Sequence, residues 1–95
     1  MSSSRIRYSK SAKKFFLSHK KIGLNFMVVF DEIIEDKSRL LFQDIVKFHS
    51  PKLKNAFRLR IGKYRAIFTV NNGDIMIYVF DVGARGDIYK HNKNI

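Results

Sequence analysis

Three arginines lie in a short stretch whose residue types alternate. The segment AFRLRIGKYRAIF, residues 56–68, carries Arg58 and Arg60 at one parity and apolar residues at the other, which predicts a half-buried strand. If residues 62–63 form a two-residue turn, the resulting hairpin places Arg60 directly opposite Arg65. Like charges that face each other across two strands are destabilising. The pattern therefore indicates a binding site for an anion.

The pair Asn72-Gly73 predicts a second two-residue turn, which adds a strand over 75–82. In this register residue 65 pairs with 80, and residue 67 pairs with 78. One face of the sheet is then apolar and suited to being covered by helices. The opposite face collects Arg58, Arg60, Arg65, Ile67, Met76, Tyr78 and Phe80.

Arginines beside exposed rings are typical of a surface that binds single-stranded nucleic acid. Guanidinium groups hold phosphate through paired hydrogen bonds, and aromatic rings stack on bases. We expect the three arginines to hold phosphate. The expected RNA-binding residues around them are Lys52, Lys54, Lys63, Tyr78 and Phe80.

Two alternatives stay open at this point. Local acids could pair with the arginines instead, but after residue 74 only Asp81 and Asp87 are close in sequence, too few to neutralise the cluster. Arg85, Asp87, Tyr89 and His91 alternate after Gly83. Their side chains either reach the phosphate site formed by the three arginines or belong to a frayed end of the chain.

The composition favours one basic domain, 1–95, whose ends at 1–4 and 91–95 are expected to be flexible. The 95 residues carry 19 Lys and Arg against 8 Asp and Glu, a net charge of +11 that attracts polyanions. Four of the acids fall within 31–36. There is no cysteine, which suits a reducing cytoplasm, and the three histidines lack metal-ligand spacing. We expect no metal, no cofactor and no membrane-spanning segment.

The order of predicted elements is typical of an α+β layer fold. A short strand at 5–8 precedes a helix over 12–20, capped by Ser9 or Ser11. Gly23 predicts a break, and from residue 22 to 34 apolar residues recur at helical spacing. The segment 37–54 reads as irregular, and strands 56–61, 64–70 and 75–82 follow. The prediction is two N-terminal helices packed on one face of a small, mainly antiparallel sheet.

The segments FRLRIGKYRAIFTV and IMIYVFDVGARGDIYK resemble the C-terminal half of RelE-family toxins, which belong to the RelE/ParE superfamily of bacterial and archaeal type II toxin–antitoxin modules. The resemblance is strong over 55–90 and looser over 5–48. It implies a microbial-RNase-like fold and a cytoplasmic ribonuclease. Such an enzyme enters the ribosomal A site, cuts the mRNA being translated and is inhibited by an antitoxin.

Carried over by position, the family's catalytic residues fall on Arg58, Arg60, Arg65, Arg85 and Tyr89. The best-known RelE pattern has lysines where this chain has Arg58 and Arg60, and an arginine does not deprotonate in proteins. The general base therefore stays open among Tyr89, Lys54, His91 and Asp87. Two other functions also stay open: a ParE-like inhibitor of DNA gyrase, and an inactive homologue that acts only by binding its antitoxin.

Overall fold

The computed structural model describes residues 5–71, 73 and 76–84. The helices are α1 (Lys10–Ser18), α2 (Lys20–Glu35) and the short 3-10 helix η1 (Lys37–Leu41). The strands are β1 (Ile6–Tyr8), β2 (Ile45–Lys47), β3 (Ala56–Ile61), β4 (Tyr64–Asn71) and β5 (Met76–Ala84). The predicted ends of the chain, 1–4 and 91–95, lie outside the described residues.

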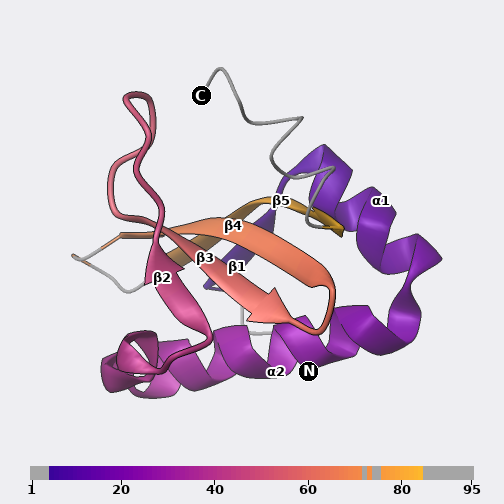
Figure 1. The fold of residues 1–95 in the computed structure, drawn as a ribbon, viewed down its shortest axis with the longest axis horizontal. Coiled ribbons are helices and arrows are strands. Elements are labelled where there is room, and N and C mark those ends of the chain that lie inside the picture. The colour runs from indigo at the N-terminus through magenta and orange to yellow at the C-terminus, as the bar shows by residue number, and fades with distance from the viewer. Residues whose placement is uncertain (1–4, 72, 74–75, 85–95) are drawn as a thin grey trace.

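The strands form one five-stranded sheet in the order β1-β5-β4-β3-β2. Strand β1 runs parallel to β5, and the other neighbours are antiparallel. Helix α2 runs along one face of the sheet, and α1 lies beside the end of β5 (Figure 1). The predicted α+β fold, with two N-terminal helices on one face of a mainly antiparallel sheet, is confirmed.

The core lies between α2 and the apolar face of the sheet. Phe26, Phe30 and Ile33 of α2 are fully buried, as the apolar spacing of that segment predicts. They join Leu59 and Phe68 of the central hairpin in one apolar cluster. The rings of Phe30 and Phe68 meet edge to face with centroids 5.3 Å apart. This packing fixes which face of the hairpin points away from the helices.

Helix α1 begins at the predicted cap. The Ser9 hydroxyl oxygen accepts a hydrogen bond from the Ala12 N–H at 3.1 Å and donates one to the Phe80 carbonyl at 2.6 Å. The N-cap thereby also ties α1 to β5, far away in sequence.

The predicted break at Gly23 is wrong, because α2 runs unbroken from Lys20 and Gly23 is buried within it. A Cβ atom at Gly23 would come within 2.8 Å of the Phe16 ring, so glycine here permits close contact between α1 and α2. The segment 37–54 was predicted to be irregular, but it contains η1 and β2. Strand β2 has only three residues, too few for alternation to be recognised.

Candidate nucleic-acid interface

The hairpin of β3 and β4 brings two arginines face to face, as predicted. Arg60 pairs with Arg65, and Arg58 pairs with Ile67 two positions along the same face. Gly62 occupies the turn with a φ of 60°, a left-handed conformation that glycine adopts without strain. We call the side of the sheet that carries Arg58, Arg60 and Arg65 the arginine face.

The predicted register of the second hairpin is wrong. Asn71 pairs with Met76, so the connection is longer than a two-residue turn, and a bulge lies between Ile67 and Phe68. Arg65 consequently pairs with Gly83 instead of Phe80, and Ile67 pairs with Asp81 instead of Tyr78. A glycine next to Arg65 leaves that position of the arginine face without a side chain.

Burial varies sharply across the arginine face. Ile67 is fully buried there, although it lies outside the apolar cluster between the helices and the sheet. Arg58 and Arg65 are half-buried, whereas Arg60 is exposed. An anion that approaches this face would therefore meet Arg60 first. The buried Ile67 lies among the three arginines.

The Arg65 side chain bends back toward the hairpin turn. Its Nη1 donates to the carbonyl oxygens of Gly62 at 3.3 Å and Tyr64 at 3.2 Å. These bonds hold the guanidinium near the turn that also carries Lys63. An arginine held in this way loses less conformational entropy when it binds an anion.

Two acids lie close to the arginines. Asp81 is buried, and its Oδ1 accepts hydrogen bonds from the Val82 N–H at 2.9 Å and the Ser11 hydroxyl at 3.3 Å. Asp44, which was not among the acids predicted near the arginines, precedes β2, and its backbone carbonyl accepts a hydrogen bond from the Arg60 N–H at 2.9 Å. Only the pairing of β2 with β3 places Asp44 there, so no sequence pattern indicated it.

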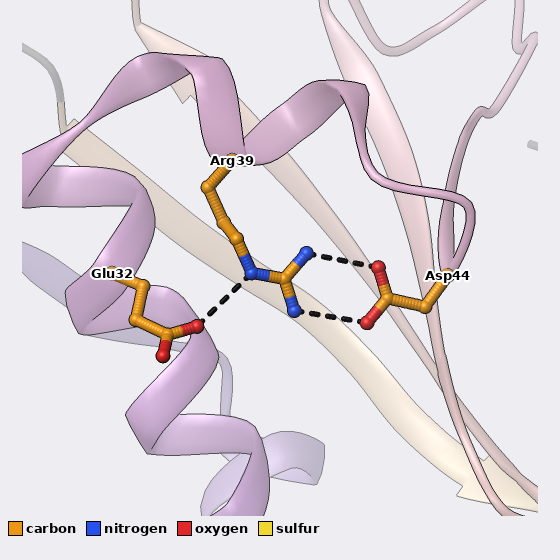
Figure 2. Close-up of polar contacts among 3 residues, drawn as sticks. All are labelled: Glu32, Arg39 and Asp44. Atoms are coloured by element: carbon orange, nitrogen blue, oxygen red, sulfur yellow. Dashed lines mark hydrogen bonds and ion pairs between the residues drawn. The ribbon is translucent and has the colours of Figure 1, made fainter.

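The Asp44 carboxylate is engaged by Arg39 of η1. Both of its oxygens accept from that guanidinium at 2.9 Å, and Glu32 of α2 accepts from Nε at 3.0 Å (Figure 2). The hydrogen bonds from Arg39 hold the pKa of Asp44 below its usual range. Its hydrogen bonds with Asp44 raise the pKa of Arg39, so the two members of this pair stay charged near neutral pH.

The predicted RNA-binding residues are spread around the arginine face. Lys52 and Lys54 lie exposed in the loop between β2 and β3. Lys63 lies at the hairpin turn, with its Nζ 5.5 Å from the centroid of the Tyr64 ring. On β5, Tyr78 is exposed and Phe80 half-buried, with ring centroids 6.3 Å apart.

The predicted register placed Phe80 opposite Arg65 and Tyr78 opposite Ile67, and the register shift removes both pairings. Tyr78 pairs with Thr69 instead. The two rings therefore lie further along β5 from Arg60 and Arg65 than the sequence predicted.

No family model matches the chain. No curated protein matches it in sequence either.

Solved structures do match. The chain is similar to a chain of the RelB–RelE antitoxin–toxin complex from Methanococcus jannaschii, with 29% identity, a TM-score of 0.65 and coverage of 90% of this chain and 96% of that one. It is also similar to a chain of the RelE–RelB complex from Pyrococcus horikoshii OT3, with 25% identity, a TM-score of 0.69 and coverage of 86% and 94%. The protein is RelE-like. The family resemblance predicted from the sequence is thereby confirmed.

A more distant match shows the fold alone. It is a chain of the RelBE2 toxin–antitoxin complex from Mycobacterium tuberculosis, with 16% identity, a TM-score of 0.51 and coverage of 84% of this chain and 95% of that one.

Some of the catalytic residues that the RelE resemblance implies lie outside the described residues. Arg85 and Tyr89 are in this group, as are the alternative general bases Asp87 and His91. Of the residues that the resemblance assigns to catalysis, the structure thus brings together Arg58, Arg60 and Arg65 on one face. Lys54, the remaining candidate base, lies in the exposed loop before β3.

An apolar groove lies between α1 and α2. It has a volume of about 510 Å³ and is lined by Tyr8, Lys13, Phe16, Leu17, Lys20, Gly23, Leu24 and Met27. Leu17 and Leu24 are exposed by 75% and 62%. Burial and the nearby charge of Asp31 raise the pKa of Tyr8 to about 12, so its hydroxyl stays protonated. We call this feature the helical groove.

Residues 5–71, 73 and 76–84 contain no group of three or more His, Cys, Asp or Glu side chains that could hold a metal ion. Among the helices of this part of the chain, none is long and apolar enough to cross a membrane.

Proposed function

We propose that this RelE-like protein is the toxin component of a toxin–antitoxin system and acts as a ribosome-dependent mRNA endoribonuclease. The observation that supports the proposal most is the facing pair Arg60 and Arg65, with Arg58 on the same face. Three arginines on one face of a hairpin are suited to a phosphate group that gains negative charge during a reaction. The proposed site of action is the ribosomal A site in the cytoplasm.

The proposed reaction needs no metal. The ribose 2′-oxygen of the mRNA attacks the adjacent phosphorus, and the bond from phosphorus to the 5′-oxygen breaks. The products are a 2′,3′-cyclic phosphate and a free 5′-hydroxyl. One group must remove the 2′-proton, and the leaving 5′-oxygen must gain a proton.

Arg58, Arg60 and Arg65 would stabilise the charge of the pentacoordinate transition state. Arg85 would act electrostatically near the leaving oxygen. Tyr89 would remove the 2′-proton or stack on the neighbouring base, with Lys54, His91 and Asp87 as the other candidate bases. Since none of the arginines can act as a base, the reaction depends on accurate positioning of the RNA, which the ribosome would supply.

We propose an acidic antitoxin as the protein partner. The net charge of +11 favours such a partner, and the similar archaeal structures are complexes of RelE with RelB. The antitoxin would cover the arginine face and block RNA. The helical groove offers it a second surface, because exposed leucines flanked by Lys13 and Lys20 suit the apolar side of an acidic amphipathic helix.

The direct test uses a translating cell-free extract with one defined mRNA. Purified protein is added, and new 5′ ends are mapped by primer extension. We expect cuts within the translated frame that vanish when ribosomes are omitted and when Arg85→Ala replaces the wild type. The absence of cuts would contradict the nuclease proposal. Cleavage of supercoiled DNA by gyrase in the presence of the protein would then favour a ParE-like function, and a negative result in both assays an inactive homologue.

A further inference from the structure

Asp44 interacts with two arginines from different parts of the fold. Its backbone carbonyl accepts a hydrogen bond from the Arg60 N–H at 2.9 Å, which fixes this residue beside the arginine face. Its carboxylate instead accepts two hydrogen bonds from the Arg39 guanidinium, both at 2.9 Å. Figure 2 shows this two-pronged contact. The acid next to Arg60 is therefore occupied by another cation.

Arg39 is itself well held. Glu32 accepts from its Nε at 3.0 Å, and its guanidinium carbon lies 4.4 Å from the centroid of the Phe42 ring. The Arg39 side chain is only 11% exposed, whereas that of Asp44 is 33% exposed. Arg39 is thus the fixed member of the pair. Asp44, more open to solvent, is the member that can turn toward a different cation.

Arg60 is a second cation that acts on Asp44, because the pKa of the Asp44 carboxyl is lowered by the hydrogen bonds from Arg39 and also by the charge of Arg60. Arg60 is exposed on β3, and the pairing of Ile45 with Leu59 places residue 44 beside residue 60. An exposed arginine with a carboxylate on the neighbouring strand ordinarily forms an ion pair. Such a pair would neutralise the arginine that an incoming anion meets first.

We propose that Arg39 is a positioning residue that holds both oxygens of the Asp44 carboxylate and so keeps Arg60 available to an RNA phosphate. This inference rests on the proposed function, because it takes RNA as the ligand of the arginine face. Without Arg39, Asp44 would pair with Arg60 and compete with the phosphate. Removing Arg39 and removing Asp44 break the same ion pair, yet they should change RNA affinity in opposite directions.

The test measures binding of a short 2′-O-methyl RNA, which cannot be cleaved through its 2′-oxygen, by fluorescence anisotropy. For Arg39→Ala we expect the affinity to fall about threefold to fivefold, the scale of one exposed ion pair. The slope of log affinity against log salt should also shrink by about 0.7, the value for one lost contact to a single strand. For Asp44→Asn we expect an affinity equal to the wild type or up to about threefold higher.

Two combined variants separate this role from simple stabilisation of the fold. Asp44→Asn should restore RNA affinity when added to Arg39→Ala, because no carboxylate is left to pair with Arg60. In an Arg60→Ala background, Arg39→Ala should have no further effect. Glu32→Gln, which keeps the Arg39–Asp44 pair, is the matched control, and thermal melts confirm folding of each variant.

Equal losses of affinity in Arg39→Ala and Asp44→Asn, with no rescue in the double variant, would overturn the inference. If Arg39→Ala fails to fold, Arg39→Lys replaces it, since a lysine keeps the charge but loses the two-pronged contact. The outcome is distinct from that of the cleavage assay. Binding that follows the expected pattern without any mRNA cleavage would refute the nuclease function alone, and cleavage with equal losses in both variants would refute the inference alone.

Discussion

The arginine face and the helical groove are built from different elements, a β-hairpin and two helices, and expose different chemistry. The arginine face carries guanidinium groups around the buried Ile67. The helical groove exposes Leu17 and Leu24, with lysines only at its margin. Phosphate is bound through charge and hydrogen bonds. An exposed apolar groove instead contributes favourably to binding only when another apolar surface covers it. The difference indicates that the arginine face suits RNA and an acidic partner alike, whereas the helical groove suits only the apolar side of a protein partner.

The largest expected effect is that of Arg65→Ala, which changes the arginine face and is measured as the rate of mRNA cleavage. We expect cleavage in the translating extract to slow by about 100-fold to 1,000-fold, because one charge contact to the transition state is lost. The initial rate of appearance of new 5′ ends is the measurement. Lys37→Ala, at an exposed cation of η1 that is not among the predicted site residues, is the control. Unchanged cleavage in Arg65→Ala would show that the reaction takes place elsewhere.

The second prediction concerns the helical groove and is measured as antitoxin binding instead of mRNA cleavage. Leu24→Asp should weaken binding of the cognate antitoxin by about tenfold to 100-fold, because a carboxylate would be buried in an apolar contact without a partner. Calorimetry or surface plasmon resonance measures the affinity, and cleavage by the free protein should not change. Leu41→Asp, the same substitution at a leucine that is 86% exposed outside the groove, is the control. Equal losses in both variants would mean that the groove has no special role.

The smallest expected effect concerns the ion pair that connects α2 and η1 to the arginine face. The pKa of Asp44 is lowered by its hydrogen bonds from Arg39, so the stabilisation is present above the ordinary Asp pKa of about 3.9. It is lost as the pH falls through the lower pKa of the folded state. The stability difference between wild type and Asp44→Asn should therefore shrink on acidification from pH 6.

Urea unfolding at several pH values measures this difference. Glu35→Gln, at an exposed acid of α2 outside the ion-pair group, is the control. A difference that stays constant down to the lowest pH would mean that the Asp44–Arg39 pair does not contribute to stability.

The sequence alone was sufficient for features that depend on neighbouring residues. Alternation in β3 and β4, together with the Gly62-Lys63 turn, correctly predicted that Arg60 faces Arg65. Helical spacing correctly predicted the buried face of α2, and the N-cap was one of the two serines expected. These features follow from the period of a strand or helix and from local hydrogen bonds, which a short sequence segment already contains.

Only the tertiary structure decided what lies beside the arginines. The shift that pairs Arg65 with Gly83 arises from the longer connection between β4 and β5 together with a bulge in their ladder. Near that bulge, β5 is contacted by Ser9, 71 residues away from Phe80. Asp44 reaches Arg60 only because the short β2 pairs with β3, and its carboxylate is held by Arg39. Contacts between residues so distant in sequence leave no periodic pattern. The sequence therefore determined which side chains face one another within a hairpin, while the packing of the helices and the edge strand decided which other charged residues lie beside them.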